Sequence, residues 1–252
     1  MNTRIQEFLL SAADIFQFVK KIFKQFFTPP LEIREIARQF YNVGNRSLFL
    51  VAFTAFLVGI VFTKQSRPSL ASFGAESWLP SLVSQAVVRS LGPLITGLIC
   101  AGKLGSNIGA ELGSMKVTEQ IDAMEVSGTR PFSYLVVTRV MATTLALPLL
   151  VIYADTMALL GSFITVAVFN NTGFMLYFND VANHVTYTDI FSSLIKSFFF
   201  GFTIGAVGAY AGYNAENGTT GVGKAANTGV VVSMLIIFII DLLSVQVTML
   251  FR

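Results

Sequence analysis

Five long apolar segments constrain this chain more than any other feature of its sequence. They lie at about residues 47–62, 79–101, 140–169, 191–213 and 226–251. A helix needs about 20 apolar residues to cross the hydrocarbon core of a bilayer. Helices and closed barrels alone satisfy their backbone hydrogen bonds in lipid, and runs of this length favour helices. The first segment is short, so it either does not cross fully or extends back to about Asn42. The third is long enough to tilt, to protrude or to bend near Pro148.

Composition supports a membrane protein and argues against several other classes. Charged residues make up 12% of the chain, against about 25% in soluble domains. The net charge of +3 is too small to indicate a nucleic-acid partner. Cys100 is the single cysteine and His184 the single histidine, so the sequence predicts neither an internal disulfide nor a metal site. We therefore predict an all-α membrane protein with about five transmembrane helices.

The basic residues predict which side of the membrane each end of the chain occupies. Lysine and arginine favour cytoplasmic loops. Seven such residues precede the first apolar segment, four lie between residues 102 and 139, and none lies in 170–190. This pattern predicts a cytoplasmic N-terminus and, after five spans, a periplasmic C-terminus. Lys64 and Arg67, in the loop after the first span, are discordant with it.

Two regions are predicted: an amphipathic N-terminal region at residues 1–40 and a membrane domain at residues 41–252. The apolar residues of the N-terminal region recur at steps of three and four, and Lys20, Lys21 and Lys24 fall between them. This spacing is typical of a helix lying in the headgroup plane of a membrane. A helix packed against the rest of the protein is an equal alternative. Pro29 and Pro30 are expected to end the helix.

A polar stretch at about 105–128 separates the second and third apolar segments, and it is predicted to be a cytoplasmic helix. One face carries an apolar stripe that continues with a shift, and the charged residues occupy the other faces; the stripe is Leu104, Ile108, Leu112 and Met115, followed by Val117, Ile121 and Met124. Gly102, Gly105, Gly109 and Gly113 recur at steps that allow helices to approach closely. The stretch is interpreted as a coupling helix that docks on a soluble motor; an ordinary solvated loop helix fits the pattern as well. The residues expected to couple are Glu111, Gly113, Met115, Lys116, Thr118, Glu119, Gln120, Asp122, Met124 and Glu125.

Three motifs in and before this stretch carry a resemblance to a known family. They read RSLGP at 89–93, AGKLGS at 101–106 and AELGSMKVTEQIDAMEVSG at 110–128. The chain resembles the MlaE-type permeases, the membrane subunits of ABC transporters that work with MCE proteins in bacterial phospholipid traffic. The likeness continues through most of the chain after about residue 31. Ser90 stands where the family often has Glu, so Arg89 lacks the usual adjacent carboxylate.

The resemblance implies a fold, partners and a location. It implies a five-span bundle preceded by an interfacial helix, working as a homodimer in the bacterial inner membrane. ATP and magnesium would be bound by separate ABC ATPase subunits, so the chain itself would be a non-catalytic permease subunit with no cofactor. An MCE-domain periplasmic lipid-binding protein would cover the outer face. Phospholipid would be held in a cavity between the two permease copies.

Residues of the second apolar segment are candidates for the lipid cavity. They are Arg89, Leu91, Gly92, Pro93, Leu94, Ile95 and Leu98. A charge at mid-membrane depth costs about 2.5–3.5 kcal/mol on insertion scales, so Arg89 is expected to face the bundle interior or water. Its guanidinium suits a phosphate headgroup. Pairing with a carbonyl or a carboxylate of another helix is the structural alternative.

Two other functions remain as alternatives to a permease powered by a separate ATPase. A stand-alone secondary transporter or channel for a lipophilic substrate predicts inverted repeats and broken helices. A lipid-modifying enzyme predicts clustered His, Asp or Glu. Neither signature is found in the sequence. The stretch from Gly218 to Lys224 has the spacing of a phosphate-binding loop, but Ala225 replaces the required Ser or Thr, so ATP binding is not expected there.

Overall fold

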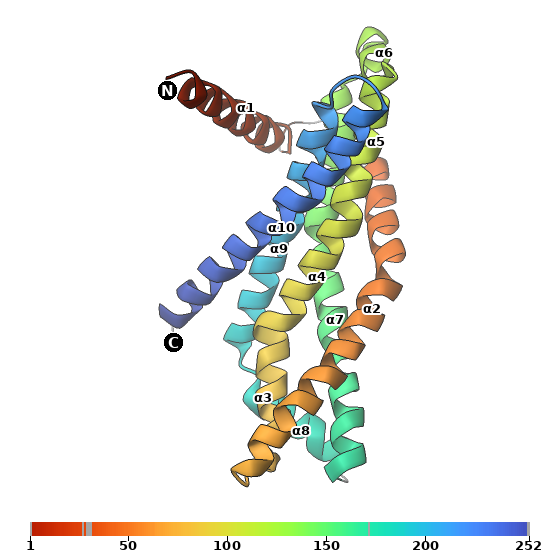
Figure 1. Cartoon of the computed structure of the whole chain (residues 1–252). Helices are drawn as coiled ribbons and strands as arrows, with labels where there is room; N and C mark the ends of the chain where they lie inside the picture. Colours follow the sequence, from red (N-terminus) through yellow and green to blue (C-terminus); the bar gives the residue numbers. More distant parts are fainter. Residues whose placement is uncertain (1, 27, 29–31, 171, 251–252) are drawn as a thin grey trace. The chain divides into compact units, whose positions relative to one another are not determined.

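A computed structural model describes residues 2–26, 28, 32–170 and 172–250, with side chains except at 2–12, 170 and 249. These residues form helices and no strands, as predicted (Figure 1). The elements are α1 Asn2–Phe26, α2 Ile33–Ser72, η1 Glu76–Trp78, α3 Leu79–Ala86, η2 Val87–Leu91, α4 Gly92–Cys100, η3 Ala101–Gly105, α5 Ser106–Val117, α6 Gln120–Val126, η4 Phe132–Val137, α7 Thr138–Asn170, α8 Phe174–His184, α9 Tyr187–Tyr213 and α10 Thr219–Leu250. The elements η2, η3 and η4 are single π-helical turns.

Five helical segments within the described residues are long and apolar enough to cross a membrane. They are Ile33–Ser72, Glu76–Val117, Phe132–Phe169, Tyr187–Tyr213 and Thr219–Thr248. This agrees with the predicted count. The first apolar segment is part of a longer helix, because the polar residues on both sides of it continue α2, so the alternative of an extended span is confirmed. With 40 residues, α2 is about 60 Å long at 1.5 Å per residue.

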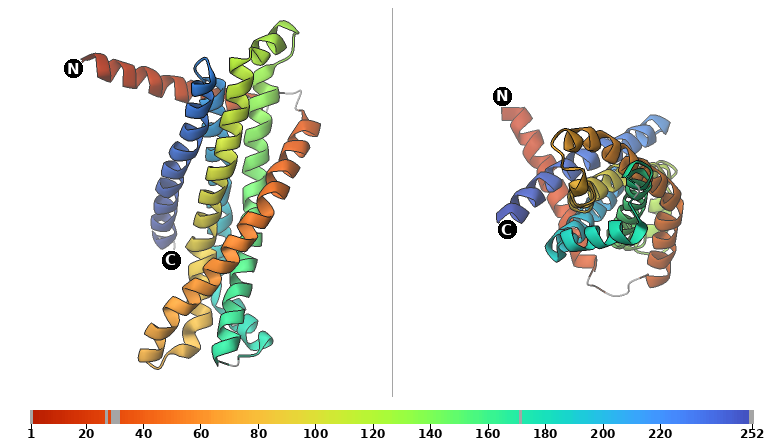
Figure 2. Two further views of the ribbon diagram at one scale, coloured as in Figure 1. Left: turned by 45° about the vertical axis from the view of Figure 1, so that its right-hand side comes forward. Right: turned by 90° about the horizontal axis from the view of Figure 1, so that it is seen from below.

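The chain divides into two compact units. Unit 1 contains residues 1–42, 101–143 and 202–233, and unit 2 contains 43–100, 144–201 and 234–252. Both are assembled from separate stretches of the sequence, so the proposed boundary at residue 40 falls close to one of several crossings. In unit 1, the chain reverses direction between α5 and η4, with α6 at the bend (Figure 2).

The core of unit 1 joins α1 to α5, η4 and α9. Ile22 of α1 is fully buried with Leu112 and Phe132, and Phe18 packs against this cluster. On the outward side of α1, Phe16 is 70% exposed and Phe23 is 51% exposed. The packed alternative is therefore confirmed for one strip of the apolar surface of α1, another strip stays open, and a position in the headgroup plane stays a prediction. The predicted stop at Pro29 and Pro30 lies outside the described residues, and α1 ends at Phe26.

Glycines bring the helices of unit 1 into backbone contact. A Cβ atom placed on Gly229 would lie 2.5 Å from the Gly105 carbonyl oxygen, and one on Gly109 would lie 2.7 Å from that of Ala225. Such distances are far below van der Waals contact, so a larger residue would force the helices apart. The glycine steps of the sequence thus predicted close packing correctly for Gly105 and Gly109; α9 and α10 supply the partner surfaces.

Unit 2 contains a buried chain of hydroxyl groups. Tyr177 of α8 donates a hydrogen bond to Ser162 Oγ at 2.8 Å, and Thr63 of α2 donates to the same oxygen at 2.8 Å. Because all three side chains are fully buried, each bond satisfies a polar group that water cannot reach. This chain links α2, α7 and α8. Burial raises the pKa of Tyr177 to about 12.

Candidate functional site

The predicted coupling helix is two helices that meet at an angle. The helix α5 ends at Val117 and α6 starts at Gln120. Between them, Glu119 has φ 57° and ψ 15°, the left-handed conformation that non-glycine residues seldom adopt. The prediction of one continuous helix over 105–128 was therefore wrong. The shift in the apolar stripe between Met115 and Ile121 is the sequence signal of this break.

The two helices differ sharply in burial. The helix α5 continues the second candidate span, and Ile108, Gly109, Leu112 and Gly113 are buried. In α6, only Ile121 is buried, and Val126 is 90% exposed. Of the residues expected to couple, those on the surface are Glu111, Thr118, Glu119, Gln120, Asp122 and Glu125; Met115, Lys116 and Met124 are half-buried and Gly113 is buried. The surface that a partner could reach is thus the bend and α6.

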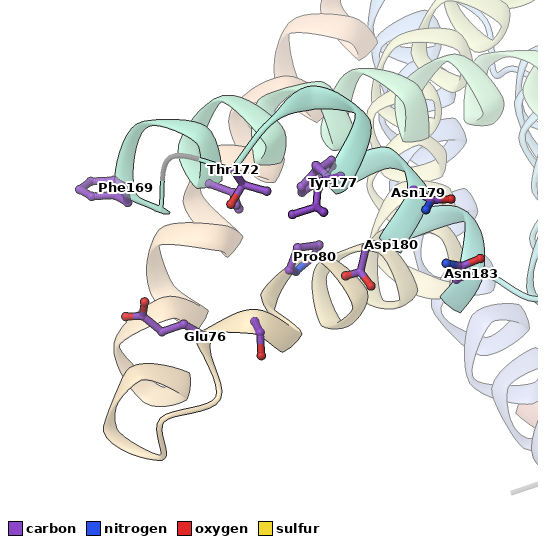
Figure 3. Close-up of a pocket in the computed structure, with 11 residues that line it drawn as sticks. Glu76, Pro80, Phe169, Thr172, Tyr177, Asn179, Asp180 and Asn183 are labelled. Atoms are coloured by element: carbon purple, nitrogen blue, oxygen red, sulfur yellow. The ribbon is translucent and has the colours of Figure 1, made fainter.

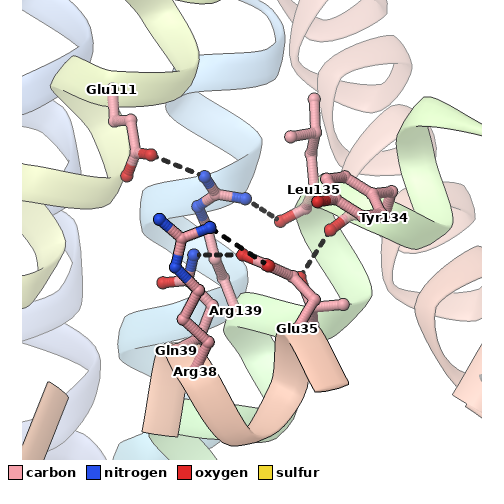
Figure 4. Close-up of polar contacts among 8 residues, drawn as sticks. Glu35, Arg38, Gln39, Glu111, Tyr134, Leu135 and Arg139 are labelled. Atoms are coloured by element: carbon pink, nitrogen blue, oxygen red, sulfur yellow. Dashed lines mark hydrogen bonds and ion pairs between the residues drawn. The ribbon is translucent and has the colours of Figure 1, made fainter. Parts of the chain in front are cut away.

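An ion pair joins α5 to α7. Arg139 Nη2 donates to Glu111 Oε1 at 2.7 Å, and its Nη1 donates to the Leu135 carbonyl at 2.8 Å (Figure 4). The Arg139 side chain is 5% exposed and that of Glu111 is 55% exposed. A buried guanidinium needs such partners, because leaving it unpaired costs several kcal/mol. Glu111 is therefore part of the frame that holds α5, and sequence reasoning missed Arg139. Its signal was a lone basic residue next to a long apolar segment.

A second ion pair spans the bend itself. Lys116 Nζ lies 3.0 Å from Asp122 Oδ1, with both side chains at least one third exposed. An exposed pair contributes at most about 1 kcal/mol. Its effect is on geometry, because it connects the end of α5 to the start of α6. Together with Glu119, this pair defines what we call the α5–α6 element, residues 106–126.

The candidate lipid-binding residues surround a π-helical turn in unit 2. Pro93 has no N–H group, so it cannot donate the bond that an α-helix would give to the carbonyl of Arg89, four residues earlier. Lys196 of α9 replaces it, donating from Nζ to that carbonyl at 2.5 Å. The same Nζ lies 2.9 Å from Asp241 Oδ1 of α10. Lys196 is 2% exposed, so it is a buried link between three helices.

The side chain of Arg89 is less constrained than its backbone. It is half-buried, and no carboxylate of the described residues lies within ion-pair distance of its guanidinium. In the same helix, Gly92 lies directly against Asp155, since a Cβ atom there would fall 1.7 Å from the carboxylate. The backbone around Arg89 is thus fixed by Lys196 and by Asp155, while the guanidinium keeps its hydrogen-bonding capacity.

The other cavity candidates do not enclose a lipid-sized space within unit 2. Leu91, Gly92 and Ile95 line a cavity of only about 10 Å³. Leu94 and Leu98 are half-buried, and Pro93 is buried. A space of 10 Å³ holds about one water molecule.

A larger pocket of about 610 Å³ lies in unit 2 between the start of α3 and the helix α8 (Figure 3). Glu76, Asn179, Asp180 and Asn183 contribute polar groups to it. One of its carboxylates has a cationic neighbour, since Arg67 lies 3.7 Å from Glu76. The His184 ring lies 3.3 Å from Asp180. The pocket is therefore polar, with part of its negative charge paired.

The stretch that resembles a phosphate-binding loop forms the start of α10. It follows the helix α9 rather than a strand, and Gly218 has a φ of 91°. Lys224 lies 2.7 Å from Glu216 Oε2 on the surface, which lowers the pKa of that carboxyl. The lysine is thus held in a local ion pair.

The helices and the charged element between the second and third spans define a multi-pass α-helical membrane protein. Residues 36–247 match the family model described as permease MlaE. The chain belongs to the MlaE permease family of ABC transporter permeases. The sequence resemblance is thereby confirmed.

Relatives from three lineages support this assignment. A probable ABC transporter permease of Rickettsia typhi is 37% identical over 211 residues, covering 84% of this chain and 82% of the relative. One from a Synechocystis strain is 35% identical, with coverages of 82% and 78%. The chloroplastic protein TRIGALACTOSYLDIACYLGLYCEROL 1 of Arabidopsis thaliana is 32% identical, covering 82% of this chain and 59% of that protein.

Proposed function

We propose that the chain is the membrane subunit of a transporter that moves phospholipids between bacterial membranes, driven by a separate ABC ATPase. Family membership supports the transporter class. The name of the Arabidopsis relative refers to a diacylglycerol lipid, which favours a lipid substrate. The basic segments favour a cytoplasmic N-terminus, and we propose the inner membrane as the location.

The observation that carries the ATPase assignment is the α5–α6 element. Its tip is acidic and exposed at Glu119, Asp122 and Glu125, while its base is fixed by Arg139 and by the contact of Gly105 with Gly229. A partner bound at the tip would therefore move α5 as a rigid body, and the attached helices with it. In this proposal the ATPase binds ATP and magnesium, and an MCE-domain protein covers the periplasmic face.

The need for external power follows from the cost of wetting a lipid. Each CH₂ group that leaves an apolar environment costs about 0.8 kcal/mol. A phospholipid with some 30 such groups would cost roughly 20 kcal/mol if fully wetted. The transporter must shelter the chains throughout. The cavity beside Gly92 has a volume of only about 10 Å³ in one chain. We therefore propose that the lipid-binding cavity forms between two copies of the chain, and that Arg89 binds the lipid phosphate there.

Co-purification tests this function. The tagged chain, expressed with the products of its neighbouring genes and extracted gently, is expected to retain an ABC ATPase and phospholipid. Glu125→Lys at the tip should abolish ATPase retention, whereas Glu32→Lys, an exposed acid ahead of α2, should not. Glu111→Lys is a poorer test, because it places a second cation against Arg139. Lipid transport by the chain alone in vesicles, without an ATPase, would reject the proposal in favour of a stand-alone transporter.

A further inference from the structure

A pocket of about 490 Å³ in unit 1 has no role in the proposed transport path. The residues Asp14, Gln17, Phe18 and Lys21 of α1 form one side of it, and Phe132 and Tyr213 form the other. We call it the α1 pocket. Four aromatic rings build its wall: the centroid of Phe18 lies 5.1 Å from that of Phe132 and 5.2 Å from that of Tyr210, and Phe132 lies 5.8 Å from Tyr213. Edge-to-face contacts of this kind hold the rings in place.

The α1 pocket lies where two candidate spans end, a level that we take to be close to the headgroups. Phe132 is the first residue of one candidate span, and Tyr213 is the last residue of another. Aromatic residues with polar tips gather at this level of a bilayer. The adjoining surface of α1 is apolar and open at Phe16 and Phe23. A molecule in the pocket would therefore lie next to the acyl chains of the bilayer on one side and face water on the other.

The pocket carries opposite charges at two points. Asp14 and Lys21 are seven residues apart on α1, hence on the same side of the helix and about 10 Å apart along its axis. Among the described residues, neither has an ion-pair partner, and the Lys21 Nζ lies 4.2 Å above the Phe132 ring. The separation leaves room for a short zwitterion between the ammonium and the carboxylate, with a hydrogen bond at each end.

We infer that the α1 pocket binds the headgroup of an amine-bearing phospholipid, with its phosphate at Lys21 and its ammonium between Asp14 and the aromatic rings. Aromatic faces attract cations, and a carboxylate beside them adds charge pairing. Gln17 and Asn214 also line the pocket and carry polar side chains that can bond to the phosphate oxygens. This lipid is a fixed ligand that anchors α1 to the bilayer surface, separate from any lipid that is transported.

Native mass spectrometry of the full chain in detergent tests the inference without any ATPase or transport. The probes are dihexanoyl phosphatidylethanolamine, dihexanoyl phosphatidylglycerol and inorganic phosphate. We expect saturable binding of the ethanolamine lipid. Lys21→Ala should weaken binding of both lipids about fivefold, the most that a partly exposed ion pair contributes. Asp14→Asn should weaken the ethanolamine lipid alone.

Lys20→Ala is the matched control, because Lys20 is the neighbouring exposed lysine of α1 outside the pocket. It should leave both affinities unchanged, and lipid bound elsewhere contributes equally to all variants. Equal loss with Lys20→Ala, or equal affinity for the two lipids with no effect of Asp14→Asn, would reduce the site to a basic surface and overturn the inference. Inorganic phosphate that displaces the lipid at similar concentration would overturn it too, in favour of a soluble anion.

Discussion

The conformation of Glu119 allows the geometry of the α5–α6 element to be separated from its charge. An L-residue in the left-handed region costs about 1–2 kcal/mol. Glu119→Gly removes this cost. Glycine also raises the conformational entropy of the unfolded chain, which lowers the free energy of unfolding by about 0.4–1 kcal/mol. The net change is a stabilisation of about 0.5 kcal/mol. Asn tolerates this region and should be neutral, whereas Val is β-branched there and should destabilise by about 1 kcal/mol or more.

These variants are compared in two assays. One measures thermal unfolding of the purified chain, and the other measures how much of the proposed ATPase partner is retained after gentle extraction. Glu119→Gly and Glu119→Asn should unfold at or slightly above the wild-type temperature. Both should nevertheless retain less ATPase, by about fivefold if the carboxylate makes an exposed ion pair with the partner. Glu119→Val should lose both stability and retention.

The reasoning would be refuted in either of two ways. If the Val variant unfolded at the wild-type temperature, the bend between α5 and α6 would not depend on the backbone of Glu119. If the Gly and Asn variants retained the ATPase fully, the carboxylate would have no part in docking. The two results are independent, so each part of the argument can fail alone.

Two further perturbations test unit 2. Lys196→Met should lower the free energy of unfolding by about 3 kcal/mol or more, because it leaves the Asp241 carboxylate unpaired. Adding Asp241→Leu should recover much of this loss, as measured by thermal unfolding. A double variant as unstable as the single one would contradict the pairing. The raised pKa of Tyr177 predicts that stability falls as pH rises from about 10 to about 12, because the unfolded chain releases its proton first. The size of this contribution is about 3 kcal/mol, so Tyr177→Phe should make the pH dependence of denaturation curves shallower by that amount; an unchanged slope would exclude Tyr177 as a source.

The sequence predicts the helices of this protein far better than their ends and contacts. Apolar length alone located the five spans, because a bilayer demands that length. It left the extent of the first span open, since a helix can continue beyond its apolar part. The bend at Glu119 had only a weak signal, a shift in the apolar stripe, because glutamate is no marker of left-handed backbone.

The exposed surface of the candidate site was predictable from the sequence. The residues that support this surface by holding the helices in place were not. The motif around Glu119 and Glu125 pointed to an exposed acidic segment, and the structure has one. The supports depend on distant residues: Arg139 is 28 positions from Glu111, and Lys196 is 107 from Arg89. Pro93 did signal a missing backbone donor, but no local pattern identifies the side chain that fills the place.

The contact between Gly105 and Gly229 has a mechanical consequence. Where side chains separate two helices, rotamer changes can absorb a small displacement before the backbone responds. Here one backbone bears directly on the other, with no soft layer between them. A displacement of α5 is then transmitted directly to α10, so that a shift of about an ångström in one helix produces a shift of nearly the same size in the other.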